Sequence, residues 1–361
     1  MKSKSISIIG LGLIGGSIAK ALKASGKDFE ISAFDKKSPV LKKALKEKTI
    51  DVILDDVNKT VSSDIIFLCL PADIALKVFE KLAPTLSGKS IITDVCGVKS
   101  IFEEKRNEIE TEAHYIGGHP MAGREVGGYK NSDAHLFENT IYLVSSFAHN
   151  CKKINEFKEI VELLGAKPQF IHPELHDKVV ARVSHLPQLL AISLVNSVGE
   201  NKEGINFLDF AAGGFRDMTR IASSPFASWK SILKYNREEI ITAIEMVSQN
   251  LTKLEDYLQC EDFENIDKLF KESRIKREKI AKNSKGFINP LFDIYFHLED
   301  EPGSLTKVLK LFLENSLSLK DIELLKDNEK LGGVFRISFE TERIANKALK
   351  ILKKAEYKIK E

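Results

Sequence analysis

Along the first third of the chain, apolar runs typical of buried strands alternate with the apolar spacing typical of helices. Four apolar runs have the length of buried strands: SISIIG (5–10), FEISAF (29–34), SDIIFLCLPAD (63–73) and KSIITDVCG (89–97). Helical patterns lie between or after them, at 17–26, 73–84 and 99–109. Strands that alternate with helices predict an α/β fold with a Rossmann-type, doubly wound parallel sheet. Ligands bind such a sheet at the carboxyl ends of its strands.

The rhythm changes at about residue 172, where long helical patterns replace the alternation. Two of them are PELHDKVVARVSHLPQLLAISLVNSV (173–198) and REEIITAIEMVSQNLTKLEDYLQ (237–259). Apolar residues at helical spacing predict helices that bury one face. We therefore expect an all-helical second domain, which supplies a lid for the substrate and a dimer interface.

The tail returns to short elements of both kinds. Strand patterns occupy 291–300, 317–325, 334–340 and 356–360, and helical patterns occupy 301–316 and 342–355. This βαββαβ order predicts a small ferredoxin-like unit. The sequence therefore predicts three domains: 1–171 for the nucleotide, 172–284 for the substrate and the dimer, and 288–361 as the third.

Composition and charge exclude several classes of protein. The 361 residues are 43% hydrophobic and 29% charged, with a net charge of +2, which is typical of a globular protein with real cores. A net charge near zero gives no argument for nucleic acid or membrane binding. No apolar run reaches the roughly 20 residues of a membrane span, and no signal-peptide layout precedes residue 5. Four scattered cysteines without CxxC spacing predict a reduced, cytoplasmic protein without a metal site.

A glycine motif directly after the first strand predicts a dinucleotide site. Gly10, Gly12 and Gly15 stand in GxGxxG spacing, where the glycines allow a tight turn and a close approach of the pyrophosphate to a helix N-terminus. Asp35 follows twenty residues later and can bind the ribose hydroxyls, which favours NAD over NADP. Lys36 and Lys37 leave some use of NADP open. The predicted cofactor contacts are Gly10, Gly12, Leu13, Ile14, Gly15 and Asp35, with Leu70, Pro71 and Asp94 at later strand ends.

The stretch GGHPMAGREVGG (117–128) holds five of the 21 glycines and one histidine, His119. That density of glycine disfavours the core of a helix or strand, so we expect a loop at a strand end. In such a sheet this loop would lie beside the nicotinamide ring. A loop histidine is often structural, but a neutral imidazole can also accept a proton near pH 7.

Three sequence blocks point to one family. GGHPMAG, HDKVVARVSHLPQ and GGFRDMTRIASSPFASW, in this order behind GLGLIGG, closely resemble the prephenate dehydrogenase family over residues 5 to about 283. The resemblance implies a Rossmann domain with a helical dimerisation domain and a homodimer. It also implies NAD-dependent oxidative decarboxylation of prephenate to 4-hydroxyphenylpyruvate, a step of tyrosine synthesis.

The resemblance also implies roles for single residues. His119 matches the family's catalytic histidine, and Arg220 matches its substrate arginine. A guanidinium binds a carboxylate bidentately, which suits that role. Asp217 is the alternative partner of Arg220, or orients it. Trp229 matches a tryptophan that reaches the substrate across the dimer; core packing is its alternative role.

Two further matches lie on one predicted helix. His185 and Gln188 are three residues apart and share a face, and both are expected to contact the substrate. The family has a second histidine where this chain has Gln188, which can donate a hydrogen bond but carries no charge. His176 also matches a family histidine. It lies half a turn out of phase with His185 on a straight helix, so we expect it to have a different, structural role.

Two positions depart from the family pattern. Many members carry a serine where this chain has Gly97, which leaves the orientation of His119 to water or to Cys96. Arg124 stands where the loop after the histidine commonly has threonine. Its guanidinium could bind a substrate carboxylate or pair with Glu125 or Asp94.

Several alternatives stay open. EPGSLTKV (301–308) resembles the start of an ACT domain, which implies an amino-acid effector, although a domain that only dimerises is also compatible. Arogenate dehydrogenase performs the same chemistry on an amino acid. A generic β-hydroxyacid dehydrogenase would leave the HPMAG and FRDMTR blocks unexplained. A catalytically silent amino-acid sensor is supported only by the missing serine at position 97. We expect no chorismate-mutase segment before residue 5.

Overall fold

The computed structural model describes residues 3–124, 126–198, 205–279, 291–299, 301–328 and 332–359. By its contacts the chain divides into two units, Met1–Asp262 and Phe263–Glu361. The first predicted domain and the second up to Asp262 therefore form one unit, and the second unit begins at Phe263. Glu125 and the predicted domain boundaries at 284 and 288 lie outside the described residues.

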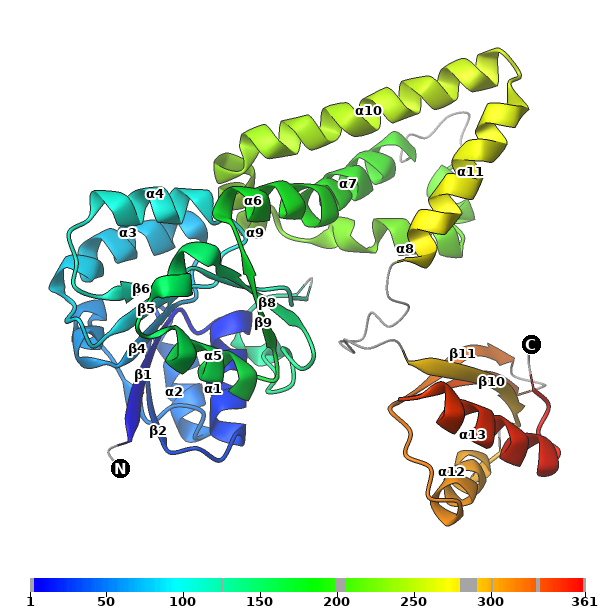
Figure 1. Ribbon diagram of the computed structural model, residues 1–361, viewed down its shortest axis with the longest axis horizontal. Helices are drawn as coiled ribbons and strands as arrows, with labels where there is room; N and C mark the ends of the chain where they lie inside the picture. Colours follow the sequence, from blue (N-terminus) through cyan, green and yellow to red (C-terminus); the bar gives the residue numbers. More distant parts are fainter. Residues whose placement is uncertain are drawn as a thin grey trace. The chain divides into compact units, whose positions relative to one another are not determined.

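A six-stranded parallel sheet forms the centre of the first unit (Figure 1). Its strand order is β3-β2-β1-β4-β5-β6, which confirms the predicted doubly wound topology. The strands are β1 (Lys4–Ile9), β2 (Phe29–Phe34), β3 (Val52–Ile53), β4 (Ile65–Leu68), β5 (Ile91–Asp94) and β6 (His114–Tyr115). The helices between them are α1 (Leu13–Ala24), α2 (Ser38–Lys46), α3 (Ala72–Leu82) and α4 (Ser100–Glu108).

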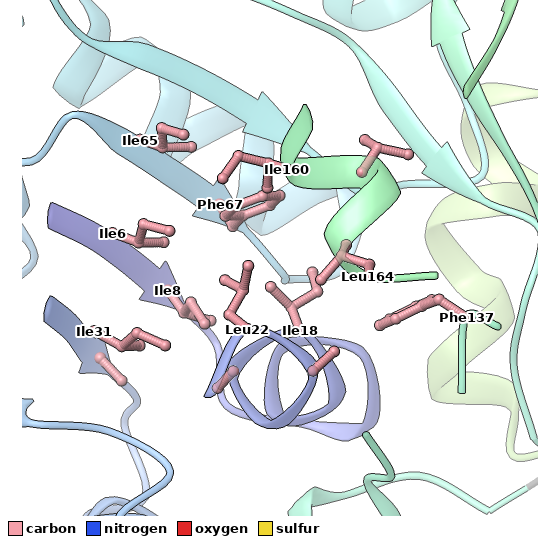
Figure 2. Close-up of a cluster of buried hydrophobic side chains, with 14 of the residues drawn as sticks. Ile6, Ile8, Ile18, Leu22, Ile31, Ile65, Phe67, Phe137, Ile160 and Leu164 are labelled. Carbon is pink, nitrogen blue, oxygen red and sulfur yellow. The ribbon is translucent and has the colours of Figure 1, made fainter. Parts of the chain in front are cut away.

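Alternate side chains of each central strand feed two separate cores. Ile6 and Ile8 of β1 pack with Ile18 and Leu22 of α1 on one face, as Figure 2 shows. Ile9 of β1 instead joins a second cluster with side chains of α3 and α4. Because successive side chains of a strand point to opposite faces, a strand covered on both sides has to be apolar throughout. That is why β4, with the sequence IIFL, does not alternate, whereas β1 alternates over residues 5–8 and its fully buried Ser7 bonds to the hydroxyl groups of Ser32 and Ser63.

A second, three-stranded sheet was not expected from the sequence. It consists of β7 (Gly118–Pro120), β8 (Ile141–Ser145) and β9 (Lys167–Ile171), and α5 (Ile154–Leu163) precedes β9. β7 pairs antiparallel with β8, with His119 opposite Leu143, and β8 pairs parallel with β9. The expectation of a plain loop around His119 is therefore wrong: the histidine belongs to a short strand.

The glycines before His119 are required by packing. A Cβ at Gly118 would lie 2.8 Å from the Tyr142 ring and 2.9 Å from the carbonyl oxygen of Asp94, and one at Gly117 would lie 2.9 Å from the Tyr115 hydroxyl. Real Cβ atoms do not approach other atoms this closely. The two glycines thus let β7 lie against β5 and β8, which holds the backbone of His119 in place.

Helices make up the rest of the first unit. They are α6 (Pro173–Val180), α7 (Leu186–Val198), α8 (Gly213–Thr219), α9 (Phe226–Tyr235) and α10 (Arg237–Gln259). A single turn of π-helix, Ala181–His185, joins α6 to α7, so the expectation of a straight helix is wrong. The combined stretch Pro173–Val198 is the one described helix long and apolar enough to span a membrane, a property that core helices share. Its most apolar window is 33% buried, and the stretch carries site residues described below.

The second unit contains α11 (Phe263–Glu278) and a small sheet with two helices. The sheet has the order β10-β12-β11 and is antiparallel, from β10 (Phe292–Leu298), β11 (Asp321–Asn328) and β12 (Gly332–Phe339). α12 (Ser304–Glu314) and α13 (Glu342–Lys354) pack on it around Phe296 and Phe312. The last predicted strand is reduced to one bridge, Phe296 with Ile359.

Candidate active site

Residues of the glycine turn line a pocket of about 410 Å³ with the end of β2. Gly10 and Gly12 form one side, and Asp35, Leu70 and Pro71 lie around it. Much of the remaining wall is apolar, from side chains that include Val40, Val57, Ile74 and Val78, and Lys36 and Lys37 also line it. The structure thus brings together five of the predicted cofactor contacts. An apolar slot with one carboxylate suits an adenosine.

Each glycine of the turn has its own steric reason. Gly10 has a φ of +95°, and a Cβ there would clash with the carbonyl oxygen of Cys69. A Cβ at Gly15 would clash with the carbonyl oxygen of Gly10, so this glycine permits the close contact of helix and strand. Gly12, in contrast, faces open space, since a Cβ there would meet no atom within 4 Å. The free volume next to Gly12 is where a pyrophosphate could approach the backbone.

The carboxylate of Asp35 is held by the backbone of its own chain. One oxygen accepts a hydrogen bond from the amide N–H of Leu11 at 2.8 Å, and the other accepts one from Lys37 N–H at 2.8 Å. These bonds tie the end of β2 to the glycine turn. A carboxylate oxygen has lone pairs for more than one donor, so Asp35 can still accept from a ribose hydroxyl.

A second pocket has a volume of about 570 Å³. The first pocket is lined by the turn up to Gly12, and the second by the two residues that follow. Leu13 and Ile14, the first residues of α1, line it with Arg124, Gln188 and Trp229. The first four N–H groups of a helix have no partner inside the helix and attract anions. Two pockets that share one glycine turn fit the two halves of a dinucleotide. Leu13 and Ile14 thus line one pocket with the predicted substrate residues, and their contact with the cofactor stays a prediction.

His119 begins a chain of hydrogen bonds that ends on a carboxylate. Its Nδ1 lies 2.8 Å from Nε2 of His176, and Nδ1 of His176 lies 2.7 Å from Oδ1 of Asp177. The same carboxylate accepts the backbone N–H groups of Lys99 at 2.8 Å and Ser100 at 2.9 Å. His176 is fully buried. Its role is thus to contact the predicted catalytic histidine, which the straight-helix argument missed.

The charges along this chain determine its protons. Burial raises the pKa of Asp177, but the hydrogen bonds from His176 and Ser100 outweigh it and leave that pKa below its ordinary value. Burial lowers the pKa of His176. Burial also lowers the pKa of His119 well below 6.5, and His176, Lys99 and His185 add to this effect. Near neutral pH we therefore expect a carboxylate and two neutral imidazoles.

The tautomers follow from these charge states. An ionised Asp177 can only accept, so Nδ1 of His176 donates to it. Nε2 of His176 then has no proton and accepts from Nδ1 of His119. The remaining nitrogen of His119, Nε2, carries the lone pair. A Cβ at position 97 would lie 3.6 Å from that nitrogen.

His185, Gln188 and Trp229 form the other side of the site. His185 is 1% exposed, and its ring meets the Trp229 ring edge-on with centroids 5.9 Å apart. Gln188 is also buried, and its side-chain NH₂ donates to the carbonyl oxygen of Ile221 at 3.0 Å. All three belong to the same chain. Trp229 also lines the second pocket of its own chain.

The prediction that Asp94 contacts the cofactor is wrong for its side chain. Asp94 is fully buried, and its carboxylate accepts hydrogen bonds from the Lys99 ammonium, the Tyr115 hydroxyl at 2.8 Å and the Cys96 backbone N–H at 2.8 Å. A buried charge needs such partners, and they use its lone pairs. Cys96 does not orient His119 either, since its thiol donates to the carbonyl oxygen of Leu70 at 3.4 Å.

The predicted arginines differ in position. Arg124 lines the second pocket and pairs with Asp133 at 2.7 Å, which excludes the alternative pair with Asp94. Arg220 begins a short 3₁₀-helix (Arg220–Ser223) and is exposed, as is Asp217. Neither is among the described residues that line the pocket, although the adjacent Ile221 is.

Two family models match the chain: "Prephenate dehydrogenase, nucleotide-binding domain" over residues 18–169, and "Prephenate dehydrogenase, dimerization domain" over residues 172–272. A prephenate dehydrogenase of Lactococcus lactis is 34% identical over 98% of this chain and 98% of its own. The chain belongs to the prephenate dehydrogenase family. The prephenate dehydrogenase of Bacillus subtilis is 30% identical over 98% of this chain and 96% of its own length.

The family also has solved structures that resemble this chain. One is a prephenate dehydrogenase from A. aeolicus in complex with hydroxyphenyl propionate and NAD⁺. It is 30% identical, with a TM-score of 0.72, and the match covers 78% of this chain and 99% of that one. Gly97 and Gln188, which depart from the family pattern, are thus features of a member of the prephenate dehydrogenase family.

Three residues of the site were missed in the sequence. Asp177 fixes His176, Lys99 neutralises Asp94, and Asn236 contacts both Asp177 and His185. The adjacent His-Asp pair at the start of a predicted helix was a usable signal for Asp177. Lys99 and Asn236 carry no signal of their own, because nothing in the local pattern around either residue identifies its partner.

Proposed function

We propose that this chain catalyses the NAD-dependent oxidative decarboxylation of prephenate to 4-hydroxyphenylpyruvate and carbon dioxide in tyrosine synthesis. The observation that carries the proposal is the chain His119–His176–Asp177, which leaves an unprotonated Nε2 on His119. The oxidation of an alcohol needs an acceptor for the hydroxyl proton, and a neutral imidazole is suited to that task. Family membership supports the substrate.

The protein's part in the reaction is to hold one proton and to orient the ring. The glycine turn and Asp35 would hold NAD, which when bound would supply the acceptor for the hydride from the ring carbon that carries the hydroxyl group. His119 Nε2 accepts the hydroxyl proton, while His176 and Asp177 stabilise the imidazolium that forms. The bond to the ring carboxylate breaks, its electron pair makes the ring aromatic, and carbon dioxide leaves. The proton returns to the phenolic oxygen, so the overall reaction consumes no proton.

NAD is the cofactor that the nucleotide pocket fits. Asp35 lies at that pocket and would repel the 2′-phosphate of NADP, while Lys36 and Lys37 line the same pocket and would attract it. We expect kcat/KM to favour NAD, and Asp35→Asn to reduce that preference. Equal or better use of NADP by the unaltered protein would show that the lysines outweigh the carboxylate.

The test of the activity is the formation of NADH from NAD and prephenate, followed by absorbance. Its product should be 4-hydroxyphenylpyruvate. Arogenate, in which an amino acid replaces the keto acid, serves as the second substrate. A higher kcat/KM on arogenate would reassign the enzyme as an arogenate dehydrogenase, and no NADH from either substrate would favour the amino-acid sensor.

We further infer that two copies associate through the helical domain. α7 exposes Leu190 and Ile192, and α10 exposes Ile241, Ile244 and Leu251, although both helices are otherwise partly buried. Apolar side chains that remain exposed on long helices favour a partner. The matched dimerization-domain description supports the same inference. Ile244→Glu should shift the sedimentation of the protein toward the monomer.

We also propose that the tail is an ACT-like domain that binds an aromatic amino acid, with tyrosine, the pathway's product, as first candidate. A pocket of about 480 Å³ lies between β10, the start of α12 and the segment after α13; His297, Ser304, Lys307 and Tyr357 line it. Gly303 precedes α12 with a φ of +90°, and a helix N-terminus suits a carboxylate.

Truncation after Ser284 tests the tail. If the shortened enzyme keeps its activity but loses inhibition by tyrosine, the tail is the sensor. Lys307→Glu in the full chain should weaken the inhibition in the same direction, with kcat unchanged. Inhibition that survives both changes and remains competitive with prephenate would place tyrosine in the active site instead.

A further inference from the structure

Asn236 occupies the junction of α9 and α10, close to His185. It is 3% exposed, and its backbone N–H and carbonyl groups are both bonded, to Ile232 and Ile240. Its side-chain nitrogen Nδ2 lies 2.9 Å from the carbonyl oxygen of Asp177 and 3.2 Å from Nδ1 of His185. The side chain therefore bridges two segments that carry site residues.

The contact with Asp177 fixes the orientation of the amide group. A backbone carbonyl oxygen can only accept a hydrogen bond, so the atom of Asn236 that faces it has to be the NH₂ nitrogen. That nitrogen has two hydrogens. The first points to Asp177, and the second is available for Nδ1 of His185. A donor at this position leaves Nδ1 of His185 as the acceptor, which puts the proton of the neutral ring on Nε2.

His185 lies beside the second pocket, because its chain neighbour Ser184 and its ring partner Trp229 both line that pocket. No described protein group forms a hydrogen bond with its Nε2 atom, and that atom is not among the described side-chain atoms that are both fully buried and unpartnered. Gln188 lines the same pocket. An N–H group in this position can donate to a bound molecule.

We propose that Asn236 is a positioning residue that fixes the Nε2–H tautomer of His185, and so presents a hydrogen-bond donor to an oxygen of the substrate. The proposal rests on the proposed function for the identity of that substrate. Prephenate offers carboxylate and keto oxygens that need donors, and one hydroxyl group that needs an acceptor. The site meets both needs, with a donor at His185 and an acceptor at His119.

Asp177 is the common origin of both tautomers. Its carboxylate accepts from His176, which passes the acceptor role on to Nε2 of His119. Its backbone carbonyl orients Asn236, which passes the donor role on to Nε2 of His185. Asp177 thus leaves His119 with a hydrogen-bond acceptor at Nε2 and His185 with a donor at Nε2.

The direct test is nitrogen NMR of the full-length protein with ¹⁵N-labelled histidine, without substrate or cofactor. His185→Gln assigns the signals of His185 by their loss. We expect a protonated Nε2 and an unprotonated Nδ1 in the unaltered protein. In Asn236→Asp a carboxylate faces Nδ1, which should move the proton to Nδ1. A protonated Nδ1 in the unaltered protein would overturn the proposal, whether or not any variant folds.

Kinetics gives the second reading. Asn236→Asp should raise the KM for prephenate on the order of tenfold, with a smaller change in kcat and the same affinity for NAD, because only the donor to the substrate is lost. Asn250→Asp, an exposed position on the same helix, is the matched control and should change neither constant. A KM that stays constant while the NMR shows the switched tautomer would also overturn the proposal. An enzyme that is inactive on prephenate but shows the Nε2–H tautomer would instead refute the proposed function.

Discussion

The cofactor half and the substrate half of the site are held in different ways. Backbone atoms fix the cofactor half: the carbonyl oxygens next to Gly10 and Gly15 leave room only for glycine, and amide N–H groups hold Asp35. Side chains fix the substrate half, through bonds that link His119, His176 and Asp177. A change in the first half should therefore act through the fold. A change in the second half should act through the position of protons, with the fold and NAD binding retained.

The most severe test of this difference is His119→Asn. The amide cannot act as a base, so kcat should fall by about 10²–10⁴, which is typical of lost acid–base catalysis. The affinity for NAD and the melting temperature should stay close to those of the unaltered protein. His135→Asn, at an exposed histidine, is the control. Near-normal turnover of His119→Asn would remove the assignment of the base.

Acid should destabilise the substrate half first. Burial lowers the pKa of His185 from 6.5 to about 4, so the unfolded state binds this proton at a higher pH than the folded state does. Its contribution to the free energy of unfolding is complete above pH 6.5 and is lost as the pH falls toward 4. The full difference is about 3 kcal/mol. His176 and His119 act in the same direction.

Denaturant titrations across this pH range check the acid effect. His185→Gln should flatten the decline by roughly the share of this one histidine, because glutamine does not titrate. A decline of the same size in the variant would show that other groups cause it.

Asp177→Asn should separate proton position from packing in a milder way. An asparagine can turn its NH₂ group toward His176 and impose the opposite tautomer on both imidazoles. Carboxylates that orient a histidine typically contribute about 10–100-fold, and we expect kcat to fall by about that factor. The affinity for NAD is the internal control, since Asp177 is not among the described residues of the nucleotide pocket. A drop in NAD affinity as large as that in kcat would contradict the division into two halves.

Arg220→Ala should have the smallest effect of the four. If the guanidinium binds a substrate carboxylate, the KM for prephenate should rise roughly tenfold or more, as for a lost charge-assisted hydrogen bond. Arg216→Ala, at an exposed arginine of α8, is the matched control. An unchanged KM would assign Arg220 to an ion pair on the protein surface, in agreement with its exposed position.

The two halves also differ in what the sequence could predict. The nucleotide turn, β1, β2 and Asp35 are close in the chain, and their spacing is a local property of one strand–turn–helix unit. The same approach failed at β7, because a strand of three residues next to two glycines is specified by its partners β5 and β8 rather than by its own pattern. Asp94 was predicted to contact the cofactor because it stands at the end of a strand. Its carboxylate instead forms a buried ion pair with Lys99, five residues later.

In the substrate half, resemblance identified the side chains but not their connections. Gln188 and His185 are both buried, and Gln188 lines the second pocket, while their contact with the substrate stays a prediction. The link from His119 to His176 joins residues 57 apart, and that from Asn236 to Asp177 joins residues 59 apart. Hydrogen bonds over such separations depend on the packing of whole helices, which no local pattern encodes.

Because of the π-turn at Ala181–His185, the number of residues between His176 and His185 determines how their rings are placed. His176 and His185 are nine residues apart, which on a regular α-helix would put them about half a turn from each other. The wider turn takes up one residue and brings both rings close to Asp177, where His176 bonds to the carboxylate and His185 is linked to the carbonyl oxygen through Asn236. Deleting one residue there would give the backbone a more regular helix, but would rotate the rest of α7 by about 100° relative to α6. In this segment a regular α-helix would need one residue fewer than the site requires.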